Sequence, residues 1–222
     1  MEAQAATVGS FAERVAGNAP CVLVGNSMGG MISLILAARR PALVSRLVLV
    51  GSVLPWAPHV GDPVVTAMFL AYATPGLGPL ALRSRRRMSP RRYVREFLSL
   101  CGVDISHLSP DIVDAMIDTV EYRRTTGWAE AAFLEAARSI MRWTVRPARH
   151  KALLAEVRCP TLVVHGTRDR LVSVKLARAA AKLYPRWDVE ILEGVGHVPQ
   201  LQVPERFAAL VTSWLSRETR AA

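Results

Sequence analysis

Short apolar runs alternate with segments of helical composition along this chain. The apolar runs lie at 21–24, 47–50, 161–164 and 189–192, and a glycine follows each of them within two residues. Runs of this kind predict strands buried on both faces of a sheet. The segments of helical composition lie at 3–15, 28–39, 173–183 and 204–215. The alternation predicts an α/β fold in which helices cover a parallel sheet.

A long segment without a strand pattern separates the second and third runs. Residues 53–158 are far more than a strand-to-helix connection needs. Apolar positions recur at helical spacing after Ser109 and Pro110, and a further helix is predicted at 128–143. We therefore expect a helical cap at 53–157, inserted into an α/β core formed by 1–52 and 158–222.

The uncharged stretch 63–82 is long enough to cross a bilayer. It is interrupted near its middle by Pro75, Gly76, Gly78 and Pro79, which break helices. The sequence therefore predicts two short buried helices here and no membrane span.

Positive charge is concentrated in one part of the chain. The formal net charge is +10, and seven arginines without an acid lie between Arg83 and Arg95. Such a cluster is either a solvated helix face or a site for an anionic partner. No RRM, zinc-finger or helix-turn-helix pattern accompanies it, so we expect no nucleic-acid partner.

Composition and cysteine usage favour a single reduced globular domain, with or without an inserted subdomain. The 222 residues are 51% hydrophobic and 21% charged. Cys21, Cys101 and Cys159 are far apart and odd in number, which indicates neither a disulfide framework nor a metal site. Residues 1–18 lack the basic and apolar regions of a signal peptide, so a cytoplasmic location is expected.

The sharpest chemical signal is the sequence GNSMGG at 25–30, between a predicted strand and a predicted helix. In that context G-x-S-x-G marks a nucleophile elbow, a tight turn that holds a serine in a strained backbone conformation. We expect Gly25 and Gly29 to leave room for the turn. Ser27 would project at the carboxyl end of the strand, and the backbone NH of Met28 would face a developing oxyanion.

A serine nucleophile needs a base, and the base needs an orienting carboxylate. Asp169 follows the third predicted strand, and His197 follows the fourth. With the chain order Ser, Asp, His, this sequence resembles the α/β-hydrolase superfamily. The resemblance implies that Ser27 is the nucleophile, Asp169 the acid, His197 the base and Met28 an oxyanion-hole donor. It also implies a small-molecule substrate and no cofactor.

The neighbours of these residues give further expectations. Asn26 and Val198 adjoin the nucleophile and the base, so they are candidate substrate contacts. His165 lies at a strand end and matches no triad position, so we expect a packed histidine. The other histidines fall in the predicted cap without metal-ligand spacing, and no metal site is expected: His59, His107 and His150.

The elbow sequence also resembles hydrolases that cleave carbon-carbon bonds in ring-fission products of aromatic compounds. Those enzymes typically carry a tryptophan after the catalytic histidine and an arginine in the cap. Here Val198 follows His197, which favours a broader hydrolase of small, largely apolar esters. Large apolar cap residues are either pocket residues or ordinary packing: Trp56, Met68, Phe69, Trp128, Phe133, Met141 and Trp143.

Part of the fold implied by the resemblance has no counterpart in this sequence. Family members place about four strands and a loop with the second oxyanion donor before the elbow, but twenty-six residues precede Ser27 here. We therefore expect a partial fold and hypothesise that Met1 is an internal or misassigned start, or that the sequence is a gene fragment. The strand at 21–24 would then be an exposed edge, open to pairing in a homo-oligomer. A catalytically incomplete fragment or scaffold is the alternative to an active hydrolase.

Overall fold

The computed structural model describes residues 1–17, 19–54 and 62–217. Within them one sheet contains four parallel strands: β1 (Cys21–Asn26), β2 (Val44–Val50), β3 (Thr161–Gly166) and β4 (Asp188–Leu192). Their order across the sheet is β1-β2-β3-β4. The predicted parallel sheet is confirmed, and every predicted strand lies within an observed one.

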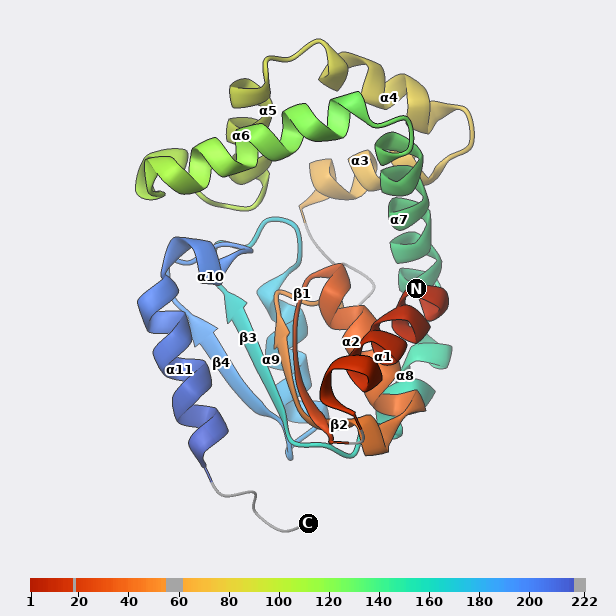
Figure 1. Cartoon of the computed structure of the whole chain (residues 1–222), viewed down its shortest axis with the longest axis vertical. Helices are drawn as coiled ribbons and strands as arrows, with labels where there is room; N and C mark the ends of the chain where they lie inside the picture. The colour runs from red at the N-terminus through yellow and green to blue at the C-terminus, as the bar shows by residue number, and fades with distance from the viewer. Residues whose placement is uncertain (18, 55–61, 218–222) are drawn as a thin grey trace.

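Helices cover both faces of the sheet (Figure 1). One face is covered by α1 (Glu2–Ala16), α2 (Met28–Arg39), α8 (Pro147–Ala155) and α9 (Val174–Leu183). The other face is covered by α11 (Pro204–Ser216), which follows the short helix α10 (Pro199–Gln202). A 3-10 turn, η1 (Pro41–Leu43), leads into β2. The helices predicted at 3–15, 28–39, 173–183 and 204–215 are confirmed.

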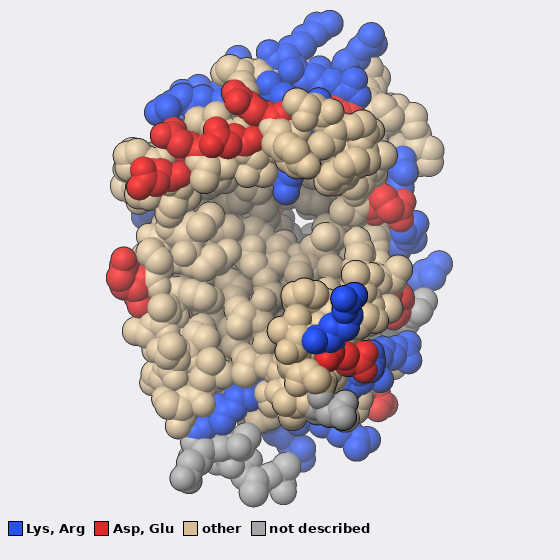
Figure 2. All heavy atoms as spheres, in the orientation of Figure 1, with Lys and Arg blue, Asp and Glu red and all other residues tan. Residues whose placement is uncertain are grey.

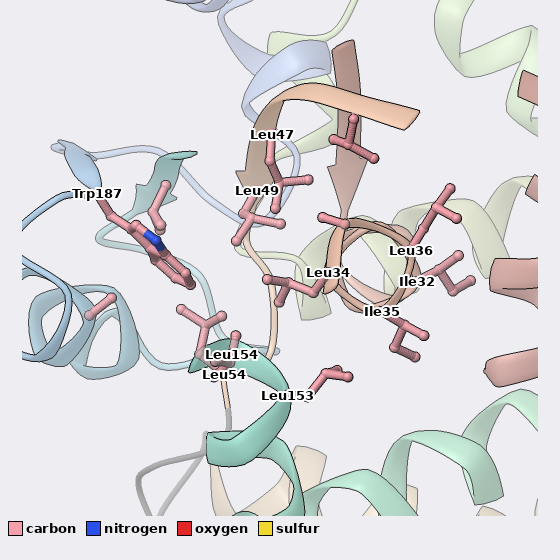
Figure 3. Close-up of a cluster of buried hydrophobic side chains, with 14 of the residues drawn as sticks. Ile32, Leu34, Ile35, Leu36, Leu47, Leu49, Leu54, Leu153, Leu154 and Trp187 are labelled. Carbon is pink, nitrogen blue, oxygen red and sulfur yellow. The ribbon is translucent and has the colours of Figure 1, made fainter. Parts of the chain in front are cut away.

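The centre of the core is β2, which is buried on both faces. Leu47 and Leu49 are fully buried against the helices of one face, together with Trp187 (Figure 3). Val48 and Val50 point to the opposite face, where they join the cluster that includes residues of α11. This alternation follows from the two-residue period of a strand and explains why the run at 47–50 is apolar throughout.

β1 departs from the prediction that it is buried on both faces. Val22 and Val24 are 42% and 53% exposed. They lie on the same sheet face as Val48, because Val24 is its partner in the parallel register. On that face Trp214 of α11 packs with the cluster around β2 and β3, and the hydrophobic cluster includes no residue of β1. β1 is the edge of the described sheet, as expected for 21–24, and its face that carries Val22 and Val24 is open.

The segment between β2 and β3 is helical throughout its described part. It contains α3 (Pro63–Ala73), α4 (Leu77–Arg86), α5 (Pro90–Leu100), η2 (Ile105–His107), α6 (Pro110–Thr125) and α7 (Ala129–Thr144), followed by α8. The helices predicted after Ser109 and at 128–143 are confirmed. Leu153 and Leu154 of α8 belong to the core cluster. A cluster of α3, α4 and α7 lies within the insertion, whereas the cluster of α5 and α6 also includes Val198 from the loop that carries His197. The division at 53–157 remains a prediction.

Local sequence explains where several of these helices begin. Asp62 and Ser89 each precede a proline. The Asp62 carboxylate accepts a hydrogen bond from the backbone NH of Val64 at 2.8 Å, and the Ser89 hydroxyl accepts one from that of Arg92 at 3.3 Å. These caps satisfy NH groups that lack an intrahelical partner, and a proline in the first turn has no NH to lose.

The stretch 63–82 forms two helical pieces, as predicted, but they are not fully buried. α3 and α4 meet at an angle of 114°. Leu70, Leu77 and Leu80 are 50%, 51% and 60% exposed, because only one side of each helix packs against the rest of the insertion. None of the described helices is by itself long and apolar enough to cross a membrane. Taken together, α3 and α4 have the length and apolar composition of a membrane span, but they are sharply bent.

Register partners of one residue type allow the edge position of β1 to be tested. Val48→Ala should lower the free energy of unfolding by about 2 kcal/mol, because it leaves a cavity in a closed core. Val24→Ala should cost less than about 1 kcal/mol, since the side chain is already half exposed. Urea unfolding monitored by circular dichroism measures both values. Equal losses would contradict an open face at β1.

Candidate active site

The turn after β1 holds Ser27 in a conformation that non-glycine residues seldom adopt. Its φ is 54° and its ψ is −118°, and it is the only non-glycine residue with positive φ in the described part of the chain. The NH of Ser27 donates to the carbonyl of Val50 at 2.8 Å, and its carbonyl accepts from the NH groups of Gly30 and Met31. Backbone strain of this kind is held by its surroundings and is typical of functional sites.

Two glycines make the turn possible, though not the pair that we expected. A Cβ on Gly25 would lie 2.6 Å from backbone atoms of Gly29 and Gly30. A Cβ on Gly30 would overlap with the Ser52 hydroxyl. A Cβ on Gly29 would meet no described atom within 4 Å outside its own helix and neighbours. The close approaches therefore require glycine at 25 and 30, and the expectation for Gly29 is wrong within the described structure.

Met28 is the first residue of α2, so its backbone NH precedes the first intrahelical hydrogen bonds of that helix. Its side chain is partly buried against the core cluster of α2 and β2. An NH at the start of a helix favours negative charge. This position suits the predicted role of Met28 in an oxyanion hole, which remains a prediction.

Asp169 and His197 form a buried pair at the carboxyl edge of the sheet. Nδ1 of His197 lies 2.7 Å from Oδ2 of Asp169, and both side chains are almost inaccessible, at 4% and 0% exposure. Oδ1 of Asp169 accepts hydrogen bonds from the NH groups of Leu171 and Val172, both at 2.9 Å. Nδ1–H therefore donates to Asp169, which leaves Nε2 of His197 as the nitrogen that can accept a proton.

A second histidine contacts the same carboxylate. Nε2 of His165 lies 3.2 Å from Oδ2 of Asp169 and 2.9 Å from the carbonyl of Val172. Burial opposes ionisation of Asp169, but hydrogen bonds from His165 and His197 outweigh it and hold the pKa of the carboxyl below its ordinary value. His165 is buried, as expected of a packed histidine, yet its contact with the acid was not foreseen.

The proton of His165 can be placed from its surroundings. Because the nearest acceptors face Nε2, the proton belongs there. Nδ1 of His165 is buried and meets no hydrogen-bond partner among the described residues. A proton on Nδ1 would therefore be an unpaired buried donor, which is costly.

Asn26 joins the elbow to the loop that carries the histidine. Its side-chain amide donates to the carbonyls of Val50 and His197, each at 3.0 Å. Gly51 fills the space between β2 and the pair, because a Cβ there would lie 3.0 Å from Nδ1 of His197 and 3.2 Å from Oδ2 of Asp169. The structure thus brings Ser27, Asp169 and His197 to one edge of the sheet. A substrate contact for Asn26 remains a prediction.

The helical insertion closes against this edge. The NH of His197 donates to the carbonyl of Cys101 at 2.7 Å, and a Cβ on Gly196 would clash with that same carbonyl. Val198 is buried in a cluster that contains residues of α5 and α6, and its predicted role as a substrate contact is untested. Burial, with a smaller contribution from Asp169, raises the pKa of the Cys101 thiol to about 12. Cys101 therefore acts here through its backbone, which no sequence motif revealed.

The remaining candidates are dispersed. Trp56 and His59 lie outside the described residues. Met68, Phe69 and Phe133 pack around Tyr72 within the insertion. Trp143 stacks on His150 and lines a cavity of about 440 Å³ beside α1, α2 and α8, which no triad residue lines. Among the described residues, no cluster of His, Cys, Asp or Glu could hold a metal ion.

A parallel sheet that leads through a strained serine into a helix, with a buried acid and histidine at the same edge, defines the α/β-hydrolase class of fold. The chain belongs to the alpha/beta hydrolase family, whose family model matches residues 2–210. The structure holds part of that fold, since the described sheet has four strands. The predicted family and partial fold are thus confirmed.

One curated relative and two solved structures illustrate the similarity. The chain is 29% identical over 204 residues to 2-hydroxymuconate semialdehyde hydrolase of Pseudomonas sp. (strain CF600), covering 90% of this chain and 63% of the relative. Cfl2 from Burkholderia cenocepacia superposes with a TM-score of 0.72 at 20% identity, over 96% of this chain and 71% of that one. The 2-hydroxy-6-oxo-6-phenylhexa-2,4-dienoate hydrolase from Rhodococcus sp. strain RHA1 superposes with a TM-score of 0.64 at 21% identity, over 90% and 66%. At these identities the structures show a shared fold, and the chain spans less than two thirds of the curated relative.

The glycines of the elbow give a matched pair of variants. Gly30→Ala should distort the turn and lower the free energy of unfolding by about 2 kcal/mol or more, because the new methyl group would overlap with Ser52. Gly29→Ala should stabilise the protein by about 0.5–1 kcal/mol, since alanine suits a helix better and meets open space. Thermal and urea unfolding measure both changes. If Gly29→Ala destabilised the protein while Gly30→Ala did not, the assignment of the close approach to Gly30 would be refuted.

The donor that His165 offers to Asp169 can be isolated by two uncharged replacements. His165→Gln can keep an NH near the position of Nε2, whereas His165→Leu removes it, and neither side chain titrates. At pH 7 the Leu variant should be less stable than the Gln variant by about 1.5–3 kcal/mol, the usual range for a hydrogen bond to a charged group.

The pH dependence of that difference follows from the lowered pKa of Asp169. A depressed carboxyl pKa contributes stability above the unfolded value, near about 3.9, which is lost as the pH falls through the folded value. The gap between the Gln and Leu variants should therefore narrow below about pH 4, as Asp169 becomes protonated. Urea unfolding across the acid range measures it. A gap that does not change with pH would show that the donor does not act on the ionised carboxylate.

Proposed function

We propose that this chain acts as a serine hydrolase, with Ser27 as nucleophile, His197 as base and Asp169 as the orienting acid. The observation that carries the proposal is the strained backbone of Ser27 at the sheet edge where Asp169 holds Nδ1 of His197. Strain at the elbow and a fixed histidine tautomer are two of the features on which this chemistry depends. Membership of the alpha/beta hydrolase family supports it.

The reaction follows from the roles of these groups. Oγ of Ser27 attacks the substrate carbonyl carbon while its proton passes to Nε2 of His197. The carbonyl oxygen becomes an oxyanion, which the NH of Met28 at the start of α2 stabilises. When the tetrahedral intermediate collapses, His197 returns the proton to the leaving group. Water then attacks the acyl enzyme by the same path and releases Ser27.

The substrate that we propose is a small, largely apolar ester or related acyl compound. The apolar cluster of α5 and α6, which includes Val198 next to His197, supports such a substrate. A cytoplasmic location remains a proposal as well. Pairing of two copies through the edge strand β1 also remains a proposal.

A carbon-carbon bond hydrolase of aromatic ring-cleavage products is the second candidate. The GNSMGG elbow at 25–30 favours it, as do the names of relatives such as 2-hydroxymuconate semialdehyde hydrolase from Pseudomonas sp. (strain CF600). Val198 in place of a tryptophan after His197 favours the ester. Parallel assays of a short-chain chromogenic ester and a ring-fission dienoate distinguish the two candidates. We expect faster turnover of the ester, whereas faster turnover of the dienoate would favour the carbon-carbon bond hydrolase.

The first test is labelling by a fluorophosphonate, which reacts quickly only with an activated serine. Intact mass spectrometry should reveal one adduct on the wild-type chain and none on Ser27→Ala. Ser52→Ala is the matched control, since it removes a buried hydroxyl beside the elbow, and it should keep the adduct.

Two results would overturn the proposal. Labelling that persists in Ser27→Ala would place the nucleophile elsewhere. A folded wild-type chain that forms no adduct would favour the incomplete or scaffold alternative. Ester hydrolysis should fall by about 10³-fold or more in Ser27→Ala, as expected when the nucleophile of a triad is removed.

A further inference from the structure

The bend between α3 and α4 exposes an apolar surface that the proposed chemistry does not use. Leu70, Leu77 and Leu80 are each at least half exposed. They flank a turn with Pro75, and no charged residue lies between 63 and 82. Exposed apolar residues that are close in sequence at one bend are candidates for a site of contact, unlike apolar residues scattered singly over a surface.

The same helix continues into positive charge. Leu77, Leu80, Arg83 and Arg87 are exposed and recur at spacings of three and four residues, so they share one side of α4 and of the turn that ends it. We call these four residues the docking face. Its leucines lie at the bend and its arginines at the opposite end of α4, next to the start of α5.

Several arginines around the docking face have no acidic partner. Arg86 pairs with Glu130, and Arg92 pairs with Glu96. Arg85 lies over the rings of Tyr72 and Tyr93. The others are exposed and form no ion pair with a described acidic side chain: Arg83, Arg87, Arg91 and Arg95. Their charge is therefore available to a partner.

The charge of the insertion is unevenly distributed. Figure 2 shows Lys and Arg side chains gathered over the end of the molecule formed by α4 and α5, beside a row of acidic side chains. Four acidic residues are exposed along α6: Asp111, Asp114, Asp118 and Glu121. The basic region is thus bounded, and an anionic surface would be attracted on the α4 side and repelled on the α6 side.

We propose that the docking face binds the surface of an anionic lipid bilayer, with the leucines inserted at the boundary between headgroups and acyl chains. Exposed apolar side chains beside arginines are the chemistry of interfacial membrane binding, in which burial of apolar area adds to attraction by anionic lipids. A polyanion such as nucleic acid would use the arginines and leave the leucines exposed. The contact is peripheral and requires no membrane-spanning helix.

Vesicle sedimentation with the full chain tests the proposal. The probes are vesicles of phosphatidylcholine alone and vesicles that also contain phosphatidylglycerol. The chain should sediment with the anionic vesicles, and its affinity should fall as salt is raised, because exposed charges are screened. Binding to neutral vesicles should be weaker by about tenfold or more, since several arginines contribute to the attraction.

Two double variants separate the components of the docking face. Leu77→Gln with Leu80→Gln and Arg83→Glu with Arg87→Glu should each lower affinity for anionic vesicles by about tenfold or more. The control variant, Leu183→Gln with Arg178→Glu, changes an exposed leucine and an exposed arginine of α9, outside the insertion. It should leave vesicle binding unchanged. All substituted side chains are exposed, so circular dichroism should show unaltered folding.

Each contrary result overturns the proposal. Wild-type chain that sediments with neither vesicle excludes a bilayer as the partner. Loss of binding in the arginine variant with no loss in the leucine variant would indicate a general anion-binding face. A dimer in analytical ultracentrifugation that the leucine variant abolishes, without vesicle binding, would assign the face to a second copy of the chain.

Discussion

The buried carboxylate of Asp169 determines how the candidate site is arranged at the carboxyl ends of the strands. It is fully buried, and each of its oxygens has two hydrogen-bond partners, from two backbone NH groups and two imidazole rings. A buried charge without such partners would be prohibitively costly. The turn after β3, the strand end that carries His165 and the loop that carries His197 must therefore take up one arrangement. The conditions for burying the acid are the same conditions that orient the histidine.

Much of the candidate site could be predicted because its members carry local signals. Ser27 lies in a glycine-rich turn between a strand and a helix, and Asp169 and His197 each follow a strand. Helix ends were similarly accessible, since proline and short polar residues act within one turn. Features that depend on a distant segment were not accessible. The edge position of β1 was expected because the preceding strands of the family have no counterpart here. An apolar run does not show whether a helix covers it, so the exposure of Val22 and Val24 on one face was missed.

The same limit explains the errors at the elbow and around the acid. Gly30 needs to be glycine because Ser52, at the end of another strand, approaches it, and no pattern within 25–30 records that approach. His165 reaches Asp169 because the chain turns back after β3. The spacing of four residues carries no such information outside a helix. The roles of Gly30 and His165 depend on contacts with segments that are not adjacent in a sequence motif. Those expected of Ser27, Asp169 and His197 follow from their places after strands.

The pairing of β2 with β3 has a consequence for how this chain reaches its structure. Val50 is the register partner of Val164, although the whole helical insertion lies between them. The units β1–α2–β2 and β3–α9–β4 each have contacts between near neighbours in sequence, which can begin to form before the two units meet. The sheet is complete only after a long loop has closed, and topologies dominated by such distant pairings fold slowly. Until that step the faces of two half-sheets are open to solvent, and folding competes with association between chains.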